Sequence, residues 1–78
     1  SNNYRDFLIL HEVALNSHLT QRDLAKRLGL ALGLINLRLQ RLSRAGHLHV
    51  AEMGRNRIQY LITPKGLLEK NVDQLYHS

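Results

Sequence analysis

The sequence contains no cysteine and no tryptophan, and it has one proline and one phenylalanine. Without cysteine the chain cannot form a disulfide or a zinc site with thiolate ligands, so a reducing, cytoplasmic environment is expected. The longest apolar run, at residues 28–35, is interrupted by two glycines and is much shorter than the ~20 residues that span a bilayer. No charged segment followed by an apolar one opens the chain, so we expect neither a signal segment nor a membrane partner.

Catalytic signatures are also absent from the sequence. It contains no phosphate-binding glycine motif, no nucleophile elbow and no pair of carboxylates with catalytic spacing. His47 and His49 alternate to one face of a predicted strand, but no third ligand has a recognisable spacing with them, so surface histidines are expected there. We therefore expect no metal site, no cofactor and no enzymatic activity.

Positive charge is concentrated in the middle of the chain. The net charge is +5, and residues 20–65 carry nine basic residues against two acidic ones. The segments 1–19 and 66–78 each have one more acidic than basic residue. A basic centre between slightly acidic ends favours a polyanionic partner that is met by the middle of the chain. A basic surface that serves only solubility is the alternative from charge alone.

The chain is expected to fold as one domain over residues 1–78, because it has no internal repeat, low-complexity tract or flexible linker. Helical periodicity predicts a first helix over 4–15. Alternating apolar and polar residues predict a hairpin, or wing, over 47–62. A last helix is expected over 64–77, where Pro64 fits the first helical position because a proline there sacrifices no helical hydrogen bond.

The second and third helices are predicted from their end signals. Thr20 is a good N-cap for the second helix, with Asp23 at the reciprocal capping-box position, where Glu or Gln is preferred. Gly29 can adopt the left-handed conformation that ends this helix. The third helix is expected from residue 31 or 32 to 45. Residues 20–45 therefore form a predicted helix-turn-helix.

The hairpin strands are expected to place alternate side chains on the core. In the first strand Leu48 and Val50 are predicted to face inward, and in the second Ile58, Tyr60 and Ile62 share one face. These elements together predict a mainly α fold with a small β-hairpin, an α+β arrangement. The expected architecture is a winged helix-turn-helix with a three-helix core, a wing and a C-terminal helix.

The sequence resembles the MarR-like winged helix-turn-helix transcription regulators between residues 19 and 70. The matching segments are LTQRDLAKRLGL at 19–30, Ile35-Asn36 with Leu39, Leu42 and Gly46, and YLITPKG at 60–66. The combination is similar to a short subgroup of the family that is associated with bacterial exopolysaccharide gene clusters. The resemblance implies a homodimer that holds the third helix of each subunit in the major groove of DNA and the wing near the minor groove.

The outer face of the third helix is the expected DNA-reading surface. At 100° per residue Ile35, Leu39 and Leu42 form a buried stripe, which leaves the opposite side exposed. Amides pair with adenine, arginines with guanine or phosphate, and leucines with thymine methyls. The DNA-binding residues predicted from this helix are Leu32, Gly33, Asn36, Leu37, Gln40, Arg41 and Arg44. The start of the second helix adds Thr20, Gln21 and Arg22, and the wing tip adds Arg55, Asn56 and Arg57.

Two alternatives to a DNA-binding regulator that occupies promoters remain open. Recognition helices of the family usually begin with Ser or Thr, whereas this one opens with the apolar segment 31–34 and has Leu37 where a polar residue is common. A leucine-rich helix also suits a protein-protein interaction module. The third possibility is the DNA-binding part of a longer, ligand-responsive regulator, although no effector pocket is evident in the sequence.

The terminal helices carry more apolar residues than a small core needs. These residues are Tyr4, Phe7, Leu8, Val72, Leu75 and Tyr76. Pairing with the terminal helices of a second copy would bury them and set two recognition helices about one DNA turn apart. We therefore expect a homodimer bound to double-stranded DNA.

Overall fold

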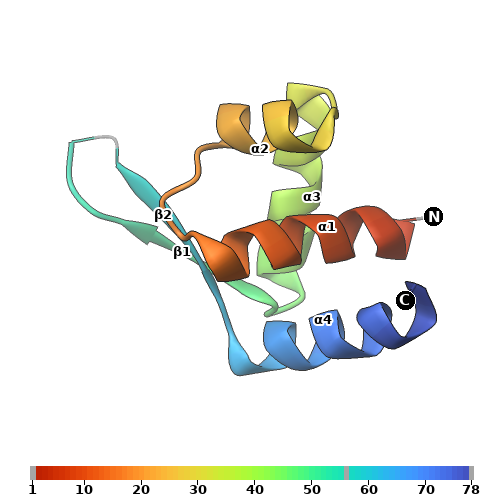
Figure 1. Ribbon diagram of the computed structural model, residues 1–78. Helices are drawn as coiled ribbons and strands as arrows, with labels where there is room; N and C mark the ends of the chain where they lie inside the picture. The colour runs from red at the N-terminus through yellow and green to blue at the C-terminus, as the bar shows by residue number, and fades with distance from the viewer. Residues whose placement is uncertain (1, 56, 78) are drawn as a thin grey trace.

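The computed structural model describes residues 2–55 and 57–77, and the side chains of residues 4–55 and 57–75. The predicted class is confirmed, because these residues form four helices and one two-stranded antiparallel hairpin. α1 and α4 lie side by side, α2 lies on the other side of α1, α3 crosses behind α1, and the hairpin extends away from the helices (Figure 1). The elements are α1 (Asn2–Leu15), α2 (Gln21–Leu28), α3 (Leu32–Arg44), β1 (Leu48–Glu52), β2 (Ile58–Ile62) and α4 (Pro64–His77). Among the described residues, every helix falls short of the length and apolarity that a bilayer crossing requires.

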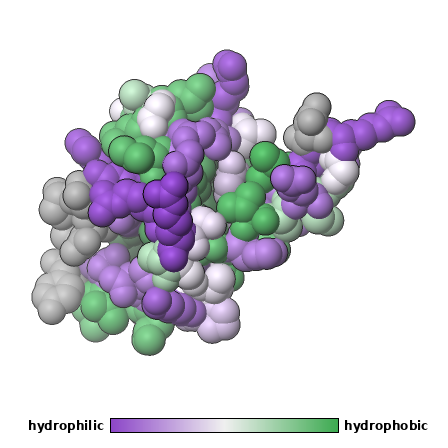
Figure 2. Space-filling view, turned by 180° about the vertical axis from the view of Figure 1, so that it is seen from behind, coloured by the Kyte–Doolittle hydropathy of each residue, from purple (hydrophilic) through white to green (hydrophobic). Residues whose placement is uncertain are grey.

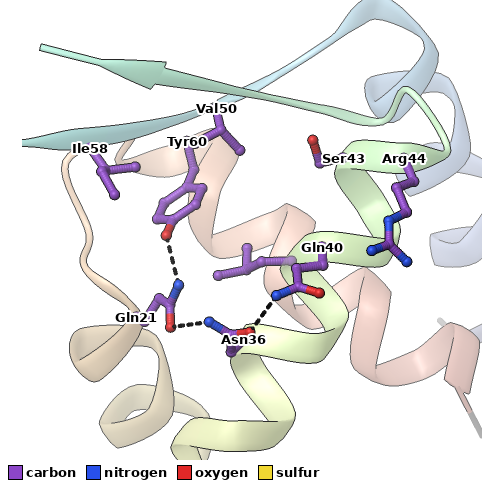
Figure 3. Close-up of a pocket in the computed structure, with 9 residues that line it drawn as sticks. Gln21, Asn36, Gln40, Ser43, Arg44, Val50, Ile58 and Tyr60 are labelled. Atoms are coloured by element: carbon purple, nitrogen blue, oxygen red, sulfur yellow. Dashed lines mark hydrogen bonds between the residues drawn. The ribbon is translucent and has the colours of Figure 1, made fainter.

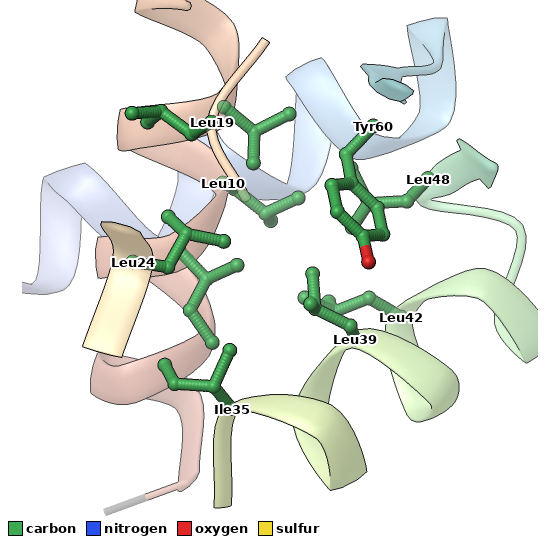
Figure 4. Close-up of a cluster of buried hydrophobic side chains, with 10 residues drawn as sticks. Leu10, Leu19, Leu24, Ile35, Leu39, Leu42, Leu48 and Tyr60 are labelled. Atoms are coloured by element: carbon green, nitrogen blue, oxygen red, sulfur yellow. The ribbon is translucent and has the colours of Figure 1, made fainter. Parts of the chain in front are cut away.

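The hydrophobic core lies between α1, α2, α3 and the base of the hairpin (Figure 4). The predicted stripe of Ile35, Leu39 and Leu42 is confirmed, since each is at most 3% exposed. The side chains that complete this core are Ile9, Leu10, Val13, Leu19, Leu24, Leu48 and Tyr60. Burial of apolar area is what drives these elements together.

The helix-turn-helix is held by the end signals that the sequence predicts. The Thr20 hydroxyl accepts a hydrogen bond from the amide of Asp23, and the Asp23 carboxylate accepts one from the amide of Thr20, each at 3.0 Å. Asp23 therefore completes the capping box in place of the usual Glu or Gln. Gly29 ends α2 in the left-handed conformation with φ 66°, and its amide donates to the carbonyl of Ala25. These contacts set the tight turn from which α3 starts.

The segment from Thr63 to Gly66 fastens the end of α3 to the start of α4. The Thr63 hydroxyl donates to the carbonyl of Gly46 at 2.6 Å and accepts from the amide of Gly66 at 2.9 Å. The Lys65 ammonium donates to the carbonyl of Ala45 at 2.8 Å. The last carbonyl groups of a helix have no hydrogen-bond partner within the helix, and side chains from another segment can supply one. The direction of α3 is therefore tied to that of α4.

The hairpin has the predicted faces but not the predicted burial. Leu48 pairs with Ile62, Val50 with Tyr60, and Glu52 with Ile58. Leu48 and Tyr60 are buried, as expected, but Val50 is 38% exposed and Ile58 is 46% exposed. Val50 is turned toward α3, as predicted, but it lines an open pocket because the hairpin extends beyond the helices that cover its base (Figure 1). The apolar residues nearer the wing tip therefore stay partly open to solvent.

Charged side chains are buried where α1, α3 and α4 meet, which the apolar pattern did not predict. Arg38 of α3 and Asp73 of α4 are each 5% exposed. Asp6 of α1 has a buried carboxyl oxygen, Oδ1, with no hydrogen-bond partner among the described residues. Burial raises the pKa of Asp6, and the charge of Asp73 adds to this shift, whereas the charges of Arg38, Arg41 and His47 oppose it.

Candidate nucleic-acid interface

One side of α3 has no contact with the core. Gly33, Leu37, Gln40 and Arg44 lie opposite the buried stripe and are exposed. Leu37 is 51% exposed and adds apolar surface to this side of the helix. On the side of the molecule facing away from α1, hydrophilic side chains form a band with apolar patches at its edges (Figure 2). This surface therefore combines polar, cationic and apolar groups.

Cationic side chains flank both ends of this side of α3. At its start, Leu32 shares an open pocket with Arg22 and Lys26 of α2. Near its end, Arg44 lines a pocket that is closed on the other side by the wing. The exposed Arg55 and Arg57 line a further pocket on the wing itself. The α2 cations lie beside the start of the outer side of α3, and the wing lies beside its end.

Several basic residues of the 20–65 segment interact with other groups of the protein. Arg38 is buried in the charged cluster, and Arg27 forms an ion pair with Glu12 of α1, with 2.8 Å between Nε and Oε2. Lys65 holds the end of α3. Arg41 is exposed, and its charge opposes the rise that burial causes in the pKa of Asp6 of α1. The charge count alone therefore overstates the number of cations available to a polyanion.

A chain of hydrogen bonds connects the wing, α2 and α3 (Figure 3). The Gln21 side-chain amide donates to the hydroxyl of Tyr60 at 3.1 Å. The Asn36 amide donates to Oε1 of Gln21 at 3.2 Å, and the Gln40 amide donates to Oδ1 of Asn36 at 2.8 Å. Tyr60 is 5% exposed, Gln21 and Asn36 are partly buried, and Gln40 is exposed. We call these four residues the amide relay, which runs from the core to the surface.

The amide relay borders an open pocket of about 320 Å³ between α3 and the wing. Leu39, Val50 and Ile58 form its apolar wall, and Ser43 and Arg44 complete its rim (Figure 3). From the sequence, Tyr60 was predicted only to share a strand face with Ile58 and Ile62, and the hydrogen bond of its hydroxyl was missed. The signal that could have found it is chemical, because a buried tyrosine hydroxyl needs a hydrogen-bond partner.

The structure brings most of the predicted DNA-binding residues to this surface or its margins. Gln21 and Asn36 are partly buried in the amide relay, and Asn56 lies outside the described residues. Thr20 is engaged in the capping box. The predicted DNA-binding residues with exposed positions are Thr20, Arg22, Leu32, Gly33, Leu37, Gln40, Arg41, Arg44, Arg55 and Arg57.

The predicted dimer residues lie on the neighbouring helices α1 and α4. Tyr4, Val72 and Leu75 are exposed, with Leu75 at 81%, whereas Phe7 and Leu8 are partly buried. The ring of Phe7 stacks between those of Tyr4 and His11, with centroids 6.5 Å and 5.8 Å away. The side chain of Tyr76 lies outside the described residues.

A helix-turn-helix followed by a hairpin and a closing helix defines a winged helix-turn-helix protein. The model of the winged helix-turn-helix DNA-binding family matches residues 2–46, more than half of the chain, and the chain belongs to this family. A search of curated proteins returned no match.

The fold is similar to that of a solved structure, the MarR family protein Rv2887 of Mycobacterium tuberculosis in complex with salicylic acid. The TM-score is 0.76, with 18% sequence identity over 91% of this chain. The chain spans 54% of the length of that protein. The predicted MarR-like winged helix fold is confirmed, and membership of the exopolysaccharide-associated subgroup stays a prediction.

Proposed function

We propose that the chain reads duplex DNA in a sequence-dependent manner and regulates transcription by occupying promoter DNA. The observation that carries this proposal is the outer side of α3, exposed and flanked by the cations of α2 and of the wing. The 13 residues of α3 make a helix about 20 Å long. An α-helix with its side chains is about 10–12 Å across, which matches the major groove, about 12 Å wide.

The surrounding side chains suit the parts of a DNA duplex that such docking brings near them. Arg22 and Lys26, beside the start of α3, are placed to neutralise phosphates, which position a protein without reading sequence. Gln40 and Leu37 face outward between them and the wing, where amides and methyl-contacting side chains discriminate bases. Arg55 and Arg57 on the wing suit the backbone or a narrow minor groove, whose potential attracts arginine.

The first test is selection of duplexes from a random DNA library by the purified protein, followed by affinity measurements at several salt concentrations. We expect an enriched motif, and an affinity whose logarithm falls with the logarithm of salt by about 0.9 per neutralised phosphate. Weak retention without a motif, disappearing at moderate salt, would contradict sequence reading.

A protein-interaction module is the second candidate, and the exposed leucines favour it. Leu32 is 41% exposed and Leu37 is 51% exposed on the outer side of α3. An apolar interface changes little with salt, whereas release of counterions from DNA gives a steep dependence. A salt-insensitive complex with a protein, together with no DNA motif, would favour this candidate.

We also propose that the functional unit is a homodimer joined through α1 and α4. Tyr4, Val72 and Leu75 leave apolar surface open on these helices, and a two-fold pairing would bury the same surface on both copies. Sedimentation at micromolar concentration should give twice the 9.0 kDa mass of the chain. Leu75→Glu should shift the protein toward monomer and weaken binding to an inverted repeat more than to a single half-site. A monomer for the unmodified chain under these conditions would contradict the proposal.

A further inference from the structure

We propose that Gln40 reads an adenine and that the hydroxyl of Tyr60, which touches no DNA, restrains the orientation of Gln40 through Gln21 and Asn36. The inference rests on the proposed binding of duplex DNA and assigns separate roles to the amides on this surface. Gln40 is the reading residue, and the other three members of the amide relay are positioning residues.

The first step of the argument is the position of the four side chains. Tyr60 is nine-tenths or more buried at the base of the wing, whereas Gln40 is exposed on the outer side of α3. Three consecutive hydrogen bonds of 3.1, 3.2 and 2.8 Å connect them through Gln21 and Asn36. The outer end of the amide relay is therefore fixed to a residue that the core holds in place.

The second step is the hydrogen-bonding capacity that remains at each amide. A side-chain amide has two N–H donors and one carbonyl oxygen. Asn36 uses one N–H for Gln21 and one lone pair of its oxygen for Gln40, and its side chain is partly buried, so it is less open to a base than the exposed Gln40. Gln40 uses one N–H for Asn36 and retains a second N–H together with Oε1. One donor beside one acceptor is the pattern that pairs with N7 and N6 of adenine.

The third step is the direction of the amide relay. If all four members reversed their donor and acceptor roles, Gln40 would accept from Asn36 and present two N–H groups. Two donors match N7 and O6 of guanine instead of adenine. The direction in the structure, with Gln40 donating to Asn36, therefore favours adenine. Without the Tyr60 hydroxyl, the side chain of Gln21 keeps only the hydrogen bond from Asn36, so the amide of Gln21 can rotate. The orientation of Gln40 is then less restricted.

The test compares three variants in library selection and in competition between sites that differ at one base pair. Gln40→Ala removes the reading residue, and Tyr60→Phe removes only the hydroxyl. Gln59→Ala is the matched control, because Gln59 is adjacent on β2 and donates to the hydroxyl of Ser17 at 3.2 Å, outside the amide relay. The ratio of affinities for two sites is independent of the folded fraction, so lost stability alone does not change it.

We expect the unmodified protein to select adenine at one position of each half-site. Gln40→Ala should reduce discrimination at that position about tenfold, which corresponds to one lost bidentate contact, and leave the other positions unchanged. Tyr60→Phe should reduce discrimination at the same position at least threefold, with unchanged affinity for a duplex of unrelated sequence. Gln59→Ala should preserve every base preference.

Two outcomes would overturn the inference while leaving the proposed function intact. The first is a motif whose base preferences are the same in Tyr60→Phe as in the unmodified protein. The second is loss of a guanine preference in Gln40→Ala, which would mean that the amide relay runs in the opposite direction. A protein that selects no motif at all would instead overturn the proposed function, and this inference with it.

Discussion

Gly66 lies directly against the backbone carbonyl group of His47, where the end of α3 meets the start of α4. A Cβ atom on Gly66 would be 2.9 Å from the carbonyl carbon of His47 and would overlap its oxygen. Glycine is a poor helix former, so its place in the first turn of α4 is unfavourable from sequence alone. The close approach of two backbones explains it.

Gly66→Ala should destabilise the protein by about 2 kcal/mol, because overpacking against backbone outweighs the gain in helix propensity. Gly33→Ala is the control, since Gly33 is exposed inside α3 and no described atom lies within 4 Å of its added Cβ. That variant should gain about 0.5–1 kcal/mol. Urea unfolding of both variants measures the difference. Equal stabilisation by the two substitutions would contradict the packing at Gly66.

Asp6→Asn should make the protein more stable at neutral pH. Burial raises the folded-state pKa of Asp6 above its ordinary value of 3.8. Between these two values the folded protein binds more protons than the unfolded chain, so stability falls as pH rises through that window. The asparagine variant lacks this loss, so its advantage should shrink as pH falls from above the raised pKa toward 3.8 and should stay constant below 3.8. Urea midpoints from pH 3 to pH 7 test this, and an advantage that is independent of pH would contradict it.

Thr20→Ala should cost about 1 kcal/mol, because the hydroxyl that caps α2 is lost. Thr20→Ser is the control that retains the cap. Hydrogen bonds from Thr20 lower the pKa of Asp23 below its ordinary value of 3.8. The stability from this pair is therefore present above pH 3.8 and lost as pH falls through the lowered value. Because alanine keeps the backbone amide of Thr20, which is the larger cause of this shift, thermal unfolding of Thr20→Ala at neutral and acidic pH should show a deficit that narrows only slightly in acid.

Arg44→Ala should weaken DNA binding across sequences and reduce the salt slope by about 1, as expected for one lost phosphate contact. Arg27→Ala removes the same charge from a residue that is paired with Glu12 of α1. Its salt slope should stay close to that of the unmodified protein. Affinity titrations at several salt concentrations compare the two. Equal changes in slope would mean that general charge, and not the surface beside the wing, governs binding.

The helices and their ends were predictable because their signals are local. Thr20, Gly29 and Pro64 each act through the backbone of residues within one helical turn, so sequence spacing is enough to place them. The outer side of α3 was predictable for a similar reason, since the period of a helix assigns its faces from apolar spacing. For this surface, sequence supplied the candidate residues but not their contacts.

Tertiary structure alone decided three features. Arg38 lies on the same stripe as Ile35 and Leu42, and its buried charge acts on the carboxyl of Asp6, a residue of the distant helix α1. Val50 fits the inward alternation of a strand, but the hairpin extends past the helices that would cover it. Gln21 and Tyr60 are 39 residues apart in sequence, so their hydrogen bond exists only when α2 and the wing meet. Local pattern specifies backbone conformation and the direction of side chains, whereas burial and hydrogen-bond partners depend on which distant segments come together.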